Sequence, residues 1–136
     1  MTLLEWNENL SVGVSTIDDE HKNLVGMLNE LYDAMQAKHS EEALGGVLDG
    51  LVAYTVYHFK HEEALFAKTG YAAAAEHKKE HDDLTKHVLD VQKEYQEGAT
   101  ATLSTEVLNF LRKWLLTHIL VSDKKFGPHL NAKGIK

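Results

Sequence analysis

The sequence predicts an all-α protein, built as an up-down-up-down four-helix bundle with an extended N-terminal arm. Two observations predict this fold. The chain contains a single proline, Pro128, so the residue that most strongly interrupts helices is missing from nearly the whole chain. Four segments repeat apolar residues at spacings of three and four, and short turn-forming stretches separate them. Four such helices with short loops pack as an antiparallel bundle by default.

The first two helices are expected over residues 15–38 and 40–70. The first begins in a cluster of helix-capping residues at Ser15 and presents one apolar face to the core. The second has Ser40 as its N-cap and acidic residues in its first turn. Gly70 supplies the residue type that most often ends a helix in the left-handed conformation.

The third helix is expected to begin within residues 72–76 and to end near Gly98. The fourth begins near Thr102 or Ser104, and Gly127-Pro128 is the expected stop. A chain of 136 residues fits one domain. That domain divides into an arm at residues 1–14, the bundle at 15–130 and a tail at 131–136.

Composition removes several classes of function. The formal net charge of −7 argues against a nucleic-acid partner. Cysteine is absent, which excludes disulfides, thiolate zinc sites, iron–sulfur clusters and haem attached through cysteine. Residues 1–14 lack the basic start of a signal peptide, and no apolar run approaches the roughly 18 residues of a membrane span. We therefore expect a cytoplasmic chain that makes no membrane contact itself.

Histidine is the unusual feature, with nine residues in the chain. Five of them fall on the inward-facing apolar stripes: His21, His58, His77, His81 and His118. Glu62 lies one turn beyond His58, where an unpaired buried charge would be very costly. A lone inward histidine is more often a hydrogen-bonded core residue. Five in one small bundle favour a shared metal, because each would otherwise need its own buried acceptor. Iron, zinc, copper and manganese all fit such donors.

Asp123 is not placed in this cluster by helix periodicity. It follows His118 by five residues, which is about 140° around an ideal helix. Spacing alone therefore favours a surface position, unless the helix is distorted there.

The ordered set of motifs resembles the hemerythrins, and among them the bacterial hemerythrin-like domains. The resemblance runs from Trp6 to Leu130 and rests on Ile17-Asp18-Asp19-Glu20-His21, His58-x-x-x-Glu62, His77-x-x-x-His81 and His118-x-x-x-x-Asp123. It implies a non-haem di-iron centre with an oxo or hydroxo bridge. By this resemblance, His77, His81 and His118 bind one iron, His21 and His58 bind the other, and Glu62 and Asp123 bridge the two.

Such a site leaves one coordination position open, on the iron held by His21 and His58. A small diatomic binds there, so the resemblance implies reversible O2 binding, with NO as another ligand, and no enzymatic activity. Apolar neighbours should protect bound O2 from water. The candidates are Ile119, Leu115, Trp114, Leu24 and Leu28.

The sequence most nearly resembles the hemerythrin domain at the C-terminal end of a methyl-accepting chemotaxis receptor. That resemblance implies oxygen or redox sensing in chemotaxis signal transduction, with the remainder of a receptor as partner. A free-standing oxygen carrier or store is the alternative, and a detoxifying iron oxidase is a third class. His77-Lys-Lys-Glu80-His81 also fits the H-x-x-E-H signature of a zinc peptidase, with Glu80 as the base, but this leaves the other inward histidines unexplained.

Overall fold

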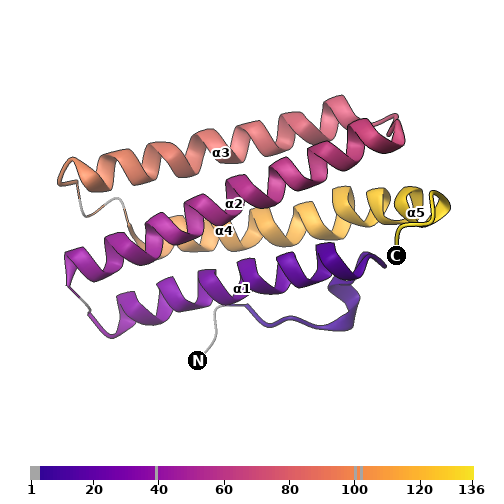
Figure 1. Ribbon diagram of the computed structural model, residues 1–136. Helices are drawn as coiled ribbons and strands as arrows, with labels where there is room; N and C mark the ends of the chain where they lie inside the picture. Colours follow the sequence, from indigo (N-terminus) through magenta and orange to yellow (C-terminus); the bar gives the residue numbers. More distant parts are fainter. Residues whose placement is uncertain (1–3, 39, 100, 102) are drawn as a thin grey trace.

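The computed structural model describes residues 4–38, 40–99, 101 and 103–136, and all regular structure within them is helical. The four long helices are α1 (Ser15–Gln36), α2 (Glu41–Thr69), α3 (Ala74–Gln96) and α4 (Thr105–Thr117). They run alternately in opposite directions and lie side by side (Figure 1). α2 packs against both α1 and α3, and α4 packs against α1. The predicted all-α four-helix bundle is confirmed.

The ends of α2 follow the predicted capping chemistry. The hydroxyl of Ser40 accepts a hydrogen bond from the backbone N–H of Ala43 at 3.1 Å. Gly70 ends the helix with a φ of 65°, in the left-handed region that favours glycine. Gly45, in the first turns, leaves room for a neighbour, because a Cβ there would lie 3.3 Å from the ring of Tyr95.

The fourth helix does not stop at Gly127-Pro128, so that prediction was wrong. α4 continues through a π-helical segment, η3 (His118–Asp123), into α5 (Lys124–Ala132). Pro128 lies in the second turn of α5, where its missing N–H forfeits one backbone hydrogen bond. Gly127 lets the arm pack closely against α5, because a Cβ at this position would collide with the backbone carbonyl of Val12 in the arm.

The N-terminal arm folds back along the bundle from residue 4 onward and includes a short 3-10 turn, η1 (Glu8–Leu10). The backbone of Leu4 exchanges two hydrogen bonds with the side chain of Asn29, at 2.9 and 2.7 Å. Val12 and Val14 are buried. Residues 1–3 of the predicted arm lie outside the described residues. The described part of the arm is therefore a packed element of the domain.

Two apolar clusters divide the interior. The first fills the bundle among α1 to α4, and the second joins the arm, η3 and α5. Ring contacts place buried histidines between them: Phe59 of the first cluster stacks on His81 at 3.9 Å between ring centroids, and Phe66 of the second lies 4.8 Å from His77. None of the helices in the described residues is both long and apolar enough to cross a membrane.

Candidate metal centre

The seven predicted ligand residues come together between the two apolar clusters. α1 supplies one of them, and α2, α3 and η3 supply two each. They are His21, His58, Glu62, His77, His81, His118 and Asp123, and none is more than 3% exposed. Their ligand atoms form two overlapping groups, each with all its atoms within 4.8 Å of one another. One group contains His77, His81 and His118, the other contains His21 and His58, and both contain Glu62 and Asp123.

Each shared carboxylate turns one oxygen toward each group. Glu62 Oε1 lies 3.0 Å from His81 Nε2, and Oε2 lies 3.3 Å from His58 Nε2. Asp123 Oδ1 lies 2.9 Å from His77 Nε2, and Oδ2 lies 3.0 Å from His21 Nε2. This orientation of two carboxylates is the one required to bridge a pair of ions.

The π-helical segment η3 brings Asp123 into this cluster. In a π-helix the backbone bonds run from residue i to i+5, which brings residues five apart much closer to one face than the roughly 140° of an ideal α-helix. His118 and Asp123 have this spacing, and they are the first and last residues of η3. Asp123 is 1% exposed, so the surface position favoured by ideal helix spacing is wrong. Helix distortion was the other possibility raised by the sequence, and it is the one observed.

The metal-ligand atoms of the cluster lie close together, but most of them do not form hydrogen bonds with one another. Both oxygens of Glu62 and of Asp123, together with Nε2 of His21, are buried and make no hydrogen bond of proper geometry within the described residues. Such groups are very costly unless a metal or a hydrogen bond compensates them. Nε2 of His118 lies 3.0 Å from that of His77 and 3.2 Å from that of His81. Neighbouring ligands about 2.1 Å from one octahedral ion lie about 3 Å apart, so the spacing of these three imidazoles fits one ion in their group.

Opposite charges dominate the electrostatics of this cluster. Burial opposes ionisation of Glu62 and Asp123, but the surrounding imidazoles outweigh it and hold the pKa of both carboxyls well below the usual range. Burial likewise disfavours charged His58, yet the negative charge of Glu62 and the hydrogen bond to Glu20 raise the pKa of His58 to about 10. Against the same burial cost, the charge of Asp123 raises the pKa of His118 to about 9. A metal must therefore displace protons from these imidazoles.

Three acidic residues to which the sequence analysis gave no role at the metal centre support the cluster from outside. Nδ1 of His58 hydrogen bonds to Glu20 at 2.6 Å, Nδ1 of His81 to Glu63 at 3.0 Å, and Nδ1 of His118 to Glu80 at 2.9 Å. A carboxylate at Nδ1 fixes the ring orientation and leaves the Nε2 lone pair for a metal.

A sequence signal for these three acids exists, but its meaning depends on the fold. Each one is next in sequence to a predicted ligand, yet it contacts a ligand on the following helix. Glu20 of α1 reaches α2, Glu63 of α2 reaches α3, and Glu80 of α3 reaches η3, which continues α4. Only the packed bundle reveals these partners.

The contacts of Glu80 also weaken the zinc-peptidase interpretation. Its carboxylate accepts hydrogen bonds from His118 Nδ1 and, at 2.7 and 2.9 Å, from the hydroxyl of Ser122. The acid that would serve as the general base is therefore already engaged in supporting a different histidine.

The remaining described histidines lie outside the two groups. Nδ1 of His61 donates to the carboxylate of Glu20 at 2.7 Å, and Nε2 of His129 donates to the hydroxyl oxygen of Thr69 at 3.0 Å. His87 packs on the ring of Phe110. His39 lies outside the described residues.

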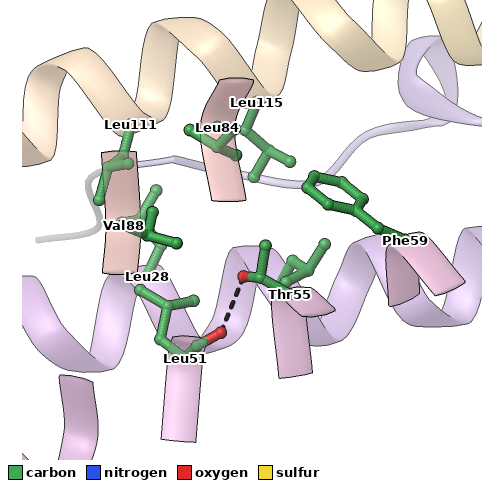
Figure 2. A pocket seen from close by; sticks show the side chains of 9 residues that line it. Leu28, Leu51, Thr55, Phe59, Leu84, Val88, Leu111 and Leu115 are labelled. Atoms are coloured by element: carbon green, nitrogen blue, oxygen red, sulfur yellow. Dashed lines mark hydrogen bonds between the residues drawn. The ribbon is translucent and has the colours of Figure 1, made fainter. Parts of the chain in front are cut away.

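An apolar cavity of about 40 Å³ lies one helical turn from the cluster. Figure 2 shows side chains from all four helices pointing into it. The hydroxyl of Thr55, the one polar side chain in the lining, donates to the carbonyl of Leu51 at 2.8 Å. Water in this space would find at most the Thr55 hydroxyl oxygen as a partner, fewer than a buried water needs, so the cavity is suited to apolar molecules.

The predicted O2 pocket corresponds only partly to this cavity. Leu24, Leu28 and Leu115 line it, whereas Trp114 and Ile119 do not. Trp114 stacks on the ring of His118 at 4.5 Å, and Ile119 is fully buried in the second apolar cluster. Because Ile119 follows His118 by one residue, it faces a different side of the helix.

Comparisons with known proteins agree with the resemblance drawn from the motifs. The family described as Hemerythrin HHE cation binding domain matches residues 12–130. The bacteriohemerythrin of Methylococcus capsulatus is 39% identical over 133 residues, covering 97% of this chain and 100% of the relative. That of Stenotrophomonas maltophilia is 35% identical over 132 residues, covering 97% of this chain and 84% of the relative. A wild-type hemerythrin crystal structure superposes with a TM-score of 0.88 at 39% identity, over 94% of this chain and 98% of its own. The chain belongs to the hemerythrin family.

Proposed function

We propose that this protein binds O2 reversibly at a di-iron centre held by the seven clustered residues. The observation that carries the proposal is the pair of donor groups that share Glu62 and Asp123. Hemerythrins bind non-haem iron, and imidazole with carboxylate is a donor set that suits it. When bound, the two irons supply electrons to O2 and recover them when O2 leaves.

The two donor groups divide the work unequally. His77, His81 and His118 with the shared carboxylates hold one iron with a nearly complete set of ligands. His21 and His58 hold the other with one imidazole fewer, so this position accepts an external ligand. We assign O2 to this two-histidine position, and a small diatomic such as NO fits the same opening.

The apolar surroundings exclude water from this position. Leu24 lies one turn from His21 on α1, and Thr55 lies one turn from His58 on α2; both residues line the dry cavity. The cavity offers a non-polar diatomic a place beside the two-histidine position while discouraging water, which would favour loss of the bound ligand and oxidation of the iron. In this proposal Leu24, Leu28 and Leu115 form the O2 pocket.

The biological use of the bound O2 has two candidates. A free-standing carrier or store needs only the site, and relatives described as bacteriohemerythrin match this chain over nearly its whole length. The second candidate is an oxygen sensor that forms the cytoplasmic domain of a chemotaxis receptor, and one observation favours it. The arm contacts the C-terminal helix directly, through Val12 against Gly127 and a 3.0 Å hydrogen bond from Asn131 to the carbonyl of Gly13. A shift at η3 would therefore reach the arm.

Metal content and oxygen stoichiometry test the proposed function together. Protein loaded anaerobically with Fe(II) should hold two irons per chain and take up one O2 for each pair, without turning over a substrate. A content of one zinc per chain with no iron would support the peptidase interpretation instead. Continuous O2 consumption in the presence of excess Fe(II) would indicate an iron oxidase.

Protease cleavage of the arm separates the carrier from the sensor. The sensor predicts different cleavage of residues 4–14 in the reduced and oxidised iron-loaded protein. The carrier predicts the same cleavage in both.

A further inference from the structure

Glu20 differs from the other two acids that contact the clustered histidines. Its side chain is 10% exposed, compared with 24% for Glu63 and 44% for Glu80. Both of its oxygens are engaged by imidazoles, Oε1 by His58 Nδ1 at 2.6 Å and Oε2 by His61 Nδ1 at 2.7 Å. Glu20 is thus a buried carboxylate clamped between a predicted ligand and a second histidine.

The clamp acts on the two-histidine position alone. His58 is one of the two imidazoles there, and the other, His21, has a buried Nδ1 with no hydrogen-bond partner in the described residues. At the three-histidine position, two of three imidazoles have a carboxylate at Nδ1. Glu20 is therefore the one carboxylate that orients a ligand at the position with fewer donors.

The acid is held as a carboxylate. Both of its oxygens lie within hydrogen-bond distance of an imidazole Nδ1, at 2.6 and 2.7 Å, and an ionised carboxyl accepts at both. A negative charge at this depth interacts more strongly with a nearby cation than a surface charge does.

We propose that Glu20 is the positioning residue of the two-histidine metal position and that His61 anchors it. Glu20 holds the His58 ring in the tautomer and orientation that present Nε2 to the metal. His61, whose side chain is 33% exposed, occupies the second carboxylate oxygen and prevents Glu20 from turning toward solvent. The inference deepens the proposed di-iron function and rests on it.

Two substitutions separate the orientation from the charge. In Glu20→Gln, the amide oxygen still accepts from His58 and the amide N–H₂ still donates to His61, so the orientation remains and the charge is lost. In Glu20→Ala, both are lost. Loss of the charge should raise the reduction potential of the iron pair, because a nearby carboxylate stabilises ferric over ferrous iron. Loss of the orientation should weaken iron binding about 10- to 100-fold at this one position.

The test measures iron release from the loaded full-length chain to an excess of ferrous chelator, together with the reduction potential. Glu30→Gln is the matched control, since it removes the same charge from an exposed position on α1. We expect Glu20→Ala to release one of its two irons about 10- to 100-fold faster than Glu30→Gln. We expect Glu20→Gln to raise the potential with unchanged helical content. His61→Phe should accelerate release to a smaller extent.

Release and potential equal to those of Glu30→Gln in both Glu20 variants would overturn the inference. Faster release of both irons alike would also overturn it, because the clamp contacts one position. If Glu20→Ala fails to fold, the potential and release rate of Glu20→Gln decide. A wild-type chain that does not hold two irons contradicts the proposed function itself, which keeps the two failures distinguishable.

Discussion

The two donor groups of the cluster differ in how firmly the protein supports them. The three-histidine group gathers imidazoles from α3 and η3, and carboxylates at Nδ1 hold two of them in orientation. The two-histidine group takes one imidazole each from α1 and α2, and among the described contacts only His58 is held in this way. In the proposed di-iron centre, the three-histidine position would retain its iron, and the two-histidine position would stay open for an exchangeable ligand.

The largest expected effect comes from the residues that the two groups share. Replacing Asp123 with Ala removes an oxygen donor from both positions and one of the two buried carboxylates that face the clustered imidazoles. We expect the variant to lose both irons, measured as metal content after gel filtration. Asp82→Ala, an exposed aspartate on α3 that is 59% exposed, is the control and should keep both. Retention of one firmly bound iron by Asp123→Ala would show that Asp123 does not bridge.

A substitution in one donor group should remove the iron from that position alone. His21→Ala leaves the two-histidine position with a single imidazole, while the three-histidine group is untouched. The expected result is a chain that holds one iron and no longer takes up O2. His129→Ala is the control, because His129 contacts Thr69 and belongs to neither group. Loss of both irons from His21→Ala would mean that the two positions fill only together.

Acidity affects both groups, because the pKa of both His21 and His58 is raised in one group and that of His118 is raised in the other. The pKa of His58 is about 10 and that of His118 about 9, compared with 6.5 for an unperturbed histidine. In the metal-free protein, the stability contributed by these charged imidazoles is fully present below about pH 6.5. It is lost as the pH rises through about 9 to 10.

Chemical denaturation of the metal-free protein between pH 6.5 and 10 checks this sign, and the free energy of unfolding should decrease across the range. Iron binding should release protons and strengthen as the pH rises, because the metal needs neutral imidazoles. A free energy of unfolding that increases with pH, or iron binding without proton release, would contradict the charge arrangement described here.

The smallest expected effect concerns the cavity beside the open position. Leu115→Phe fills space that Leu115 now borders, at a typical stability cost of about 1–3 kcal/mol. O2 association, followed by stopped flow, should slow several-fold. Ile119→Val, in the second apolar cluster, is the comparison and should leave the association rate unchanged. Equal O2 association rates in the two variants would show that O2 does not pass through the cavity.

A complementary measurement places Ile119 relative to the O2 position. If Ile119 lined the O2 pocket, Ile119→Glu would speed autoxidation of the oxygen-loaded protein. Ile119 is buried in the second apolar cluster and does not line the cavity, so we expect an unchanged decay rate. A faster decay would place Ile119 in the pocket.

Sequence periodicity was sufficient for the bundle and for most of the cluster. Inward stripes place His58 and Glu62 on one face of α2, and His77 and His81 on one face of α3, because a regular α-helix repeats every 3.6 residues. Asp123 could not be placed in this way, since η3 departs from that repeat. A π-helical segment depends on tertiary contacts and on what it presents to the core, and local sequence patterns do not reveal it.

The spacing of residues along the sequence also could not predict which side chains contact each other between helices. Glu20 sits beside His21 in the sequence but contacts His58, and only the packing of α1 on α2 decides this. The helix end predicted at Gly127-Pro128 was wrong for a related reason. Glycine and proline indicate a helix end only where local backbone preferences decide the structure. Here the arm packs so closely on α5 that Gly127 is needed for space.

Reversibility of oxygen uptake tests the central claim most directly. The iron-loaded, reduced protein should develop a near-ultraviolet oxo-to-iron absorption band when O2 is admitted and lose it under vacuum, through repeated cycles and with two irons retained per chain. A band that persists under vacuum, or that returns only after chemical reduction, would contradict reversible binding and indicate an oxidase or a redox site instead.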